Sequence, residues 1–176
     1  GSNEAHLVYQ FALPPLLLYT LRWGDGRFLT RWASSLQTPS KQTTYFNFTA
    51  SHDGIGLRPI EGLLPAAARS QILSLGQKPQ GALSYRRMHD NARQAYELNM
   101  NYFDALTPEA ELQVNPDRSI ARFIASQAIM LALQGLPGIY FHSLFGSRGD
   151  VQALRRGEQP RAINREKLDL QTLQRE

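Results

Sequence analysis

The sequence predicts an α/β fold with parallel strands, and three observations favour it. Short runs rich in β-branched and aromatic residues indicate strands at 6–11, 44–50 and 138–142. Helical patterns lie between these runs, and such alternation implies parallel strands joined by crossover helices. The runs are apolar throughout, which is typical of strands covered on both faces, as in an α/β barrel or a doubly wound sheet.

The first elements follow from local signals. Residues 6–11 (HLVYQF) predict the first strand, and Pro14-Pro15 closes it. The two prolines can also start a helix over 16–23, because the first helical position needs no N–H donor. A second short helix is predicted through three bulky residues, Phe28, Leu29 and Trp32. Residues 44–50 (TYFNFTA) then predict the second strand.

The second half begins with a different texture. Residues 51–115 are polar and rich in Gly and Pro, and only short stretches such as 65–75 favour helix. Asn115-Pro116 then starts a long amphipathic helix that ends at Gly135. Its apolar residues have three-four spacing and predict a buried face made of Ile120, Phe123, Ile124, Ala128 and Leu131. The third strand, 138–142 (GIYFH), follows.

Composition narrows the function classes. The 176 residues include 19 Lys+Arg and 15 Asp+Glu, giving a net charge of +4, but no block of like charges that would favour nucleic-acid binding. The chain has no Cys, which excludes disulfide scaffolds and thiolate sites. No apolar run approaches the roughly 20 residues of a membrane span, and no secretory leader is visible. We therefore expect a cytoplasmic protein that binds neither nucleic acid nor membrane.

The residues with chemical potential follow the second strand directly. His52 and Asp53 lie within Ser51–Gly56, at the strand end where α/β folds place their ligand sites. In a bare His-Asp pair the Asp often caps a helix and the His often satisfies a loop carbonyl, so a structural role stays open. A metal site is not expected, because one His and one Asp make an incomplete ligand shell.

Three motifs resemble one enzyme family. Residues 44–65 (TYFNFTASHDGIGLRPIEGLLP), 136–146 (LPGIYFHSLFG) and 4–15 (EAHLVYQFALPP) resemble the sucrose phosphorylase-like branch of the α-amylase superfamily, glycoside hydrolase family 13. The resemblance implies a partial (β/α)8 TIM barrel containing strands six to eight with their helices, with a long insertion at 54–115 after strand seven. Residues 1–176 would be the carboxy-terminal part of the catalytic barrel. The nucleophilic Asp and the acid/base Glu of the family would lie upstream, outside this chain.

The resemblance also implies site roles. Asp53 would stabilise the transition state, His52 would bind the same glucose, and Tyr96 and Glu97 would face the acceptor sugar. Sucrose phosphorylases have Gln in place of Glu97, so this position puts sucrose in doubt as the substrate. A carboxylate there disfavours an anionic acceptor unless an arginine compensates, the candidates being Arg86, Arg87 and Arg93. The segment 161–165 (RAINR) resembles the family's RxINR segment and is expected to fix loop carbonyls and carboxylates.

Together these residues predict part of a retaining α-glucoside phosphorylase, without a cofactor. Its partners would be an α-glucoside and inorganic phosphate, or glucose 1-phosphate in the reverse direction. Two alternatives stay open: an α-glucosidase or transglucosidase of the same superfamily, and a stand-alone half-barrel module that binds sugar or phosphate. Open sheet edges predict association with the missing barrel half or with a second copy, and the isolated chain is expected to be inactive.

Overall fold

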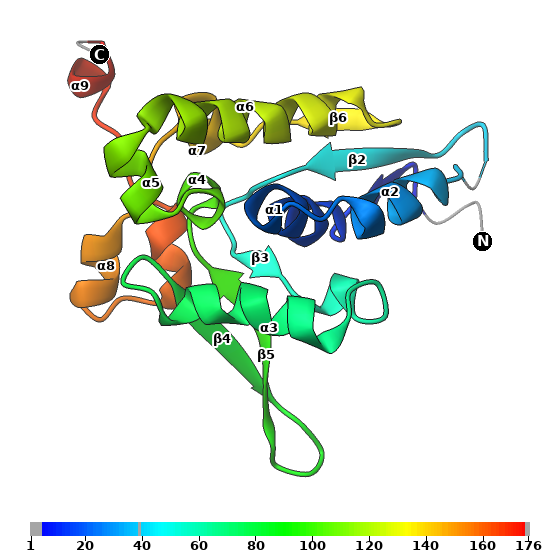
Figure 1. Cartoon of the computed structure of the whole chain (residues 1–176), viewed down its shortest axis with the longest axis horizontal. Coiled ribbons are helices and arrows are strands. Elements are labelled where there is room, and N and C mark those ends of the chain that lie inside the picture. Colours follow the sequence, from blue (N-terminus) through cyan, green and yellow to red (C-terminus); the bar gives the residue numbers. More distant parts are fainter. Residues whose placement is uncertain (1–4, 39, 175–176) are drawn as a thin grey trace.

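A computed structural model describes residues 5–38 and 40–174, so Glu4 of the first predicted motif lies outside the described residues. The fold contains two three-stranded sheets, one on each side of a central buried helix, α1 (Figure 1). This helix contacts strands of both sheets. The hydrophobic core therefore lies around α1, between the two sheets, rather than on the face of a single sheet.

The first sheet is parallel, as predicted. Its strand order is β1-β2-β6, and Tyr9 pairs with Phe46, which in turn pairs with Leu136. The three strands are β1 (Leu7–Tyr9), β2 (Thr44–Phe48) and β6 (Leu136–Gly138). Between β1 and β2 the chain forms the predicted helices, α1 (Leu13–Trp23) and α2 (Arg27–Ser34).

Helix α1 supplies the centre of the core. Proline occupies its first turn, where no N–H is needed, and Gly24 ends it with a φ of +78°. Four of its leucines are completely buried: Leu13, Leu16, Leu17 and Leu18. Burial of each such side chain contributes about 1.5–3 kcal/mol to folding.

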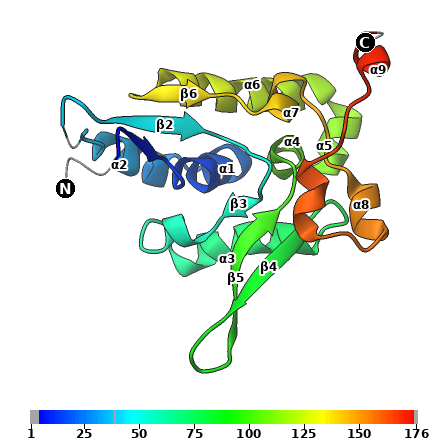
Figure 2. The same ribbon diagram turned by 180° about the vertical axis from the view of Figure 1, so that it is seen from behind.

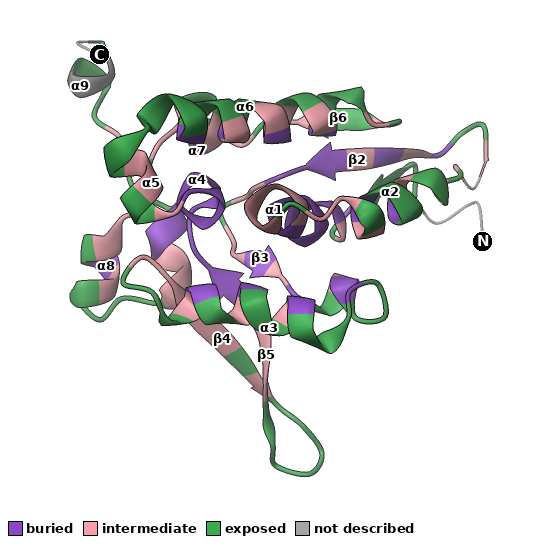
Figure 3. Ribbon diagram, viewed as in Figure 1, coloured by how far each residue is buried: buried purple, intermediate pink, exposed green. Residues whose placement is uncertain are grey.

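The second sheet was not predicted. It is antiparallel with strand order β3-β5-β4, formed by β3 (Ile55–Gly56), β4 (Ala82–Arg87) and β5 (Arg93–Asn99). Helix α3 (Ala66–Ser74) confirms the helical prediction at 65–75, and 3₁₀ turns flank it at 58–60 and 75–77. The β4–β5 hairpin extends away from the rest of the chain (Figure 1), and its tip is exposed (Figure 3).

Helix α6 (Pro116–Ala132) forms where predicted, with the Asn115 side chain accepting from the Arg118 amide at its start. Its predicted buried face is wrong. Only Phe123 of the five predicted residues is buried, and Ile120 and Ile124 are 46% and 59% exposed. The helix packs on α1, α4 and β2 through a different set, Ser119, Phe123, Ser126 and Met130. Small serines allow close packing there, so the apolar stripe faces outward.

The third strand lies two residues earlier than the predicted range of 138–142 and overlaps that range only at Gly138. It ends at Gly138, and Phe141–Leu144 forms the short helix α7, because the Tyr140 carbonyl accepts the amides of Ser143 and Leu144. His142 therefore lies in a helix, where it is buried. The expectation that all strands are covered on both faces is also wrong in the described chain, since Tyr9 of β1 is 55% exposed.

The remaining elements surround the end of the first sheet. They are α4 (Tyr102–Leu106), α5 (Glu109–Val114), α8 (Val151–Arg155), a 3₁₀ helix at Pro160–Asn164 and α9 (Leu170–Leu173). Viewed from behind, α8 and the 3₁₀ helix lie beside the β4–β5 sheet (Figure 2). This brings Arg161 and Asn164 of the 3₁₀ helix to the carboxyl ends of the parallel strands.

Candidate functional site

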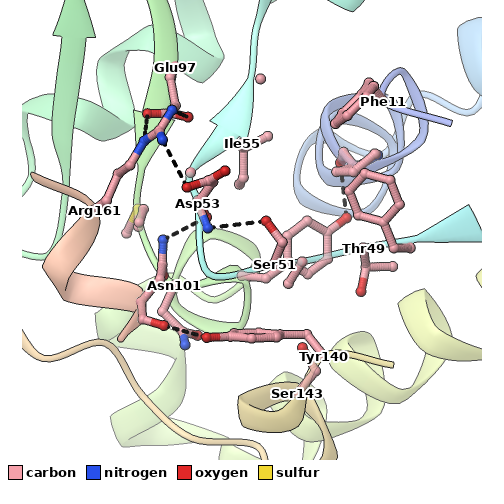
Figure 4. Close-up of a pocket in the computed structure, with 18 residues that line it drawn as sticks. Phe11, Thr49, Ser51, Asp53, Ile55, Glu97, Asn101, Tyr140, Ser143 and Arg161 are labelled. Atoms are coloured by element: carbon pink, nitrogen blue, oxygen red, sulfur yellow. Dashed lines mark hydrogen bonds and ion pairs between the residues drawn. The ribbon is translucent and has the colours of Figure 1, made fainter. Parts of the chain in front are cut away.

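A cavity of about 220 Å³ lies at the carboxyl ends of the parallel strands (Figure 4). Phe11 follows β1, Ser51 and Asp53 follow β2, and Tyr140 and Ser143 follow β6, and all of them line it. The sequence predicted ligand sites at these strand ends, and the structure brings the three ends together around one space.

Asp53 is placed in this cavity by its own loop. Its backbone amide donates to the Ser51 hydroxyl at 3.1 Å. Gly54 lets the loop lie against β5, because a Cβ added there would lie 2.6 Å from the Leu98 carbonyl oxygen. The Asp53 side chain is 35% exposed, so its carboxylate is reachable from the cavity.

Two arginines pair with the Asp53 carboxylate through the same oxygen. Nη1 of Arg161 lies 2.9 Å from Oδ1, and Nη2 of Arg165 donates to it at 3.1 Å. The His52 imidazole is farther, with Nε2 at 3.7 Å. Among the described residues, the Asp53 carboxylate accepts one side-chain hydrogen bond, from Arg165 to Oδ1, and Oδ2 accepts none.

Arg161 also binds Glu97 with two parallel hydrogen bonds. Nε and Nη2 donate to the two carboxylate oxygens at 3.0 and 2.9 Å (Figure 4). Such a bidentate pair is among the stronger charge-assisted contacts in proteins. The bonds to Glu97 are the main reason that the pKa of Arg161 is raised above its usual value. Only 6% of the Glu97 side chain is exposed.

The segment after α8 holds the His-Asp loop in place. The Asn164 amide donates to the Asp53 carbonyl at 3.0 Å, and Arg165 Nε donates to the His52 carbonyl at 3.0 Å. The Tyr140 hydroxyl donates to the Asn164 carbonyl at 2.6 Å, which ties this segment to the end of β6. The prediction that 161–165 fixes loop carbonyls and carboxylates is confirmed.

The structure separates the four predicted site residues. Asp53 and Glu97 line the same cavity. His52 is two-thirds exposed and lines an adjoining depression of about 320 Å³. Tyr96 is half-buried and does not line either space. Tyr96 is skipped in the pairing of β5 with β4, which passes from Ser84–Glu97 to Tyr85–Ala95, so strict alternation of side chains is broken at this position.

The arginine that compensates Glu97 was predicted wrongly. Arg86 donates to Gln94 in its own hairpin, and Arg93 lies over the Tyr85 ring. The compensating cation is Arg161 instead. The two residues are 64 positions apart in the chain, so no local spacing pointed to this pair.

Aromatic side chains form the wall of the depression beside His52. Four rings from β1, β2 and the segment after β1 contact one another, with centroids 5.0 to 6.0 Å apart: Tyr9, Phe11, Phe46 and Phe48. Gly138 of β6 makes room for this wall, because a Cβ there would lie 2.4 Å from the Phe46 ring. The site thus combines a paired carboxylate with an apolar, aromatic surface, a combination suited to a sugar ring.

In the described part of the chain, no cluster of three or more His, Asp or Glu side chains is placed to hold a metal ion. None of the described helices has the length and apolar character required to cross a membrane.

Several known proteins that are similar to this chain are named as phosphorylases. The chain is 40% identical over all of its residues to the glucosylglycerate phosphorylase of Escherichia coli, and 44% identical over 96% of its residues to the glucosylglycerate phosphorylase of Allomeiothermus silvanus. These matches cover 31% and 30% of the relatives. Over almost its whole length the chain is homologous to part of these glucosylglycerate phosphorylases and of sucrose phosphorylases.

Two further comparisons concern a sucrose phosphorylase and a solved structure with the same fold. The sucrose phosphorylase of Agrobacterium vitis is 29% identical over 93% of the chain and 32% of its own length. The crystal structure of the sucrose 6F-phosphate phosphorylase from Thermoanaerobacter thermosaccharolyticum has the same fold over 96% of the chain and 32% of its own length, with a TM-score of 0.77 and 23% identity. No protein-family model matches the chain. The chain spans about a third of the length of the curated relatives it matches.

Proposed function

We propose that this chain is part of a retaining α-glucoside phosphorylase that acts on glucosylglycerate. One observation carries the choice of substrate. The chain is 40 to 44% identical to three glucosylglycerate phosphorylases, and 22 to 29% identical to relatives named for sucrose, sucrose 6F-phosphate or glucosylglycerol. By sequence identity, the chain is therefore more similar to these three relatives named for glucosylglycerate than to the relatives named for the other glucosides.

In this proposal β1, β2 and β6 are strands six to eight of a (β/α)8 barrel, and 54–115 is an insertion after strand seven. The parallel pairing and the helical crossovers support it. So does the exposure of β1, since a strand inside a complete barrel would be covered on its outer edge by the preceding strand. The rest of the barrel would supply both the nucleophilic Asp and the acid/base Glu.

The proposed reaction is a double displacement. The nucleophilic carboxylate attacks the anomeric carbon of the glucosyl unit, and the bond to the glycerate oxygen breaks as the acid/base Glu protonates that oxygen. Glycerate leaves, and an oxygen of hydrogen phosphate then attacks the anomeric carbon, its proton passing to the Glu carboxylate while the bond to the nucleophilic Asp breaks. The products are glucose 1-phosphate and the free enzyme, with retained configuration at the anomeric carbon.

Asp53 would act as the third carboxylate. Asp53 lines the cavity, and its Oδ2 accepts no hydrogen bond from the described residues, so it can accept hydrogen bonds from ring hydroxyls of glucose. A negative charge there stabilises the positive charge that develops on the sugar ring. His52 would contribute from the adjoining depression, where the aromatic wall can contact the apolar face of the sugar.

The test is an acceptor panel on the complete enzyme that contains this chain. Phosphate release from glucose 1-phosphate is measured with glycerate, glycerol, fructose and fructose 6-phosphate as acceptors. We expect the highest kcat/KM with glycerate. Faster release with fructose or glycerol would contradict the substrate assignment, and phosphate release to water alone would contradict the phosphorylase assignment. The isolated chain serves as a control and is expected to be inactive.

Asp53→Asn is the matching site test. Because the contact counts most in the transition state, we expect kcat to fall by about 100-fold or more while KM for glucose 1-phosphate changes little. Unchanged turnover would refute the role of Asp53.

A further inference from the structure

The cavity holds a chain of alternating charges that crosses it from the buried side to the open side. Glu97 lies at the buried end with 5% of its surface exposed, Arg161 is in the middle, and Asp53 is at the open end. Arg165 completes the chain from the far side of Asp53. Two carboxylates and two guanidiniums make this cluster neutral.

We propose that Arg161 is a positioning residue that holds the Asp53 carboxylate in its reactive orientation, and that Glu97 acts only through Arg161. This inference rests on the proposed function and departs from the sequence-based expectation that Glu97 contacts the acceptor.

Glu97 holds the planar guanidinium of Arg161 in one orientation. The five N–H donors of the guanidinium lie in one plane in fixed directions. Glu97 accepts from Nε and Nη2 of Arg161 as a fork, which fixes the plane, and Nη1 forms an ion pair with Asp53 Oδ1 at 2.9 Å. An arginine held at one edge in this way cannot swing without breaking two charge-assisted bonds.

Arg161 and Arg165 together orient the Asp53 carboxylate. Arg161 and Arg165 approach the same oxygen, Oδ1, from two separate side chains. The opposite oxygen, Oδ2, is the one available to a substrate. Rotation of the carboxylate would separate Oδ1 from both cations, so the pair selects the orientation in which Oδ2 serves the sugar.

The hydrogen bonds and the burial of Glu97 keep its charge from acting on the acceptor. Each of its oxygens already accepts a hydrogen bond from Arg161, and its side chain is almost completely buried. Its negative charge is therefore matched by a cation within hydrogen-bond distance and does not act as a free charge on the acceptor. A negatively charged acceptor such as glycerate is then tolerated, although a carboxylate replaces the Gln of sucrose phosphorylases.

The test is a double-mutant cycle in the complete enzyme with Arg161→Gln, Glu97→Gln and the two combined. Arg161→Gln should lower kcat by about 100-fold, as expected for a displaced catalytic group, while KM for glucose 1-phosphate changes less than about threefold. It should also lower Tm, because Glu97 is left buried without its cation. The double variant should regain Tm, since no buried charge is left unpaired, but should keep the low kcat.

Two further variants separate the charge of Arg161 from its planar shape and provide a matched control. Arg161→Lys keeps the charge but loses the planar fork, so kcat should fall by about tenfold, less than in Arg161→Gln. Arg156→Gln is the matched control, because Arg156 is an exposed arginine nearby that pairs only with Asp150 and Glu158 among the described residues. It should keep the kcat and Tm of the wild type.

The cycle decides between indirect and direct action of Glu97. If Glu97 acts only through Arg161, Glu97→Gln has no further effect on kcat or on the KM for glycerate once Arg161 is Gln. If Glu97 touches the acceptor, Glu97→Gln shifts the KM for glycerate equally in both backgrounds, and the proposal is overturned. Recovery of kcat in the double variant would overturn it as well. Failure of the proposed function is distinct, because it would show as another preferred acceptor for the wild type, with which the same cycle is then measured.

Discussion

Gly54→Ala tests the close contact that sets the position of Asp53. An added Cβ would lie 2.6 Å from the Leu98 carbonyl oxygen and 2.7 Å from Glu97 Cγ, whereas ordinary contacts begin at 3.4 Å. The loop and β5 must therefore separate by about 0.8 Å, the difference between 2.6 and 3.4 Å. Overpacking of this kind costs about 1–3 kcal/mol in free energy of unfolding.

The same displacement should affect activity more than stability. Asp53 is the residue next to Gly54, and a misplacement near 1 Å can reduce turnover by about 100-fold. The assay is kcat for phosphate release from glucose 1-phosphate in the complete enzyme, with Tm measured in parallel. Gly26→Ala is the control, because its nearest contact would be Thr20 Cγ2 at 3.7 Å, and its effect should stay within about 1 kcal/mol. Wild-type kcat in Gly54→Ala would refute the reasoning.

Three further variants test contacts outside the charge chain. The Arg122 hydrogen bond lowers the pKa of Glu111, so the stability that ionised Glu111 contributes is present above pH 4.5 and is lost as pH falls through its lowered folded pKa. The stability difference between wild type and Glu111→Gln in urea should shrink below pH 4.5, and a constant difference would contradict this. Tyr102→Phe removes the buried hydroxyl that donates to a carbonyl of α1 at 3.0 Å and should cost about 1 kcal/mol in urea unfolding. Asn164→Ala removes the donor to the Asp53 carbonyl and should lower kcat more than KM for glucose 1-phosphate; an unchanged kcat would show that this bond does not position the loop.

The elements that sequence predicted well are those fixed by local chemistry. Strand β2 is a dense aromatic run, α1 begins at two prolines, and α6 begins at Asn115-Pro116. The spacing of apolar residues shows which side of α6 is apolar, but it does not show which side contacts the rest of the chain. The buried face of α6 was therefore predicted wrongly. The contacts of α6 within this chain select Ser119 and Ser126, whose small side chains permit close packing.

The antiparallel sheet was missed for a related reason. Strands β4 (ALSYRR) and β5 (RQAYELN) carry at least as many polar as apolar residues, so neither shows a clear period. Their stability comes from pairing across the hairpin, including Arg86 with Gln94 and Asn99 with Ser84. Cross-strand pairs depend on register, which a single sequence does not reveal.

The candidate site shows the same division between local and distant information. The His-Asp motif was recognised because it directly follows a strand, and the structure places Asp53 at the predicted strand ends. The effect of Glu97 was misjudged because its charge was considered with arginines close in sequence. The net charge that an acceptor meets is the sum over all groups around the cavity, and here Arg161, 64 positions away, cancels the carboxylate. A Gln-to-Glu difference therefore indicates acceptor charge only when the partner of the new carboxylate is known, and with Arg161 in place it leaves an anionic acceptor compatible with the site.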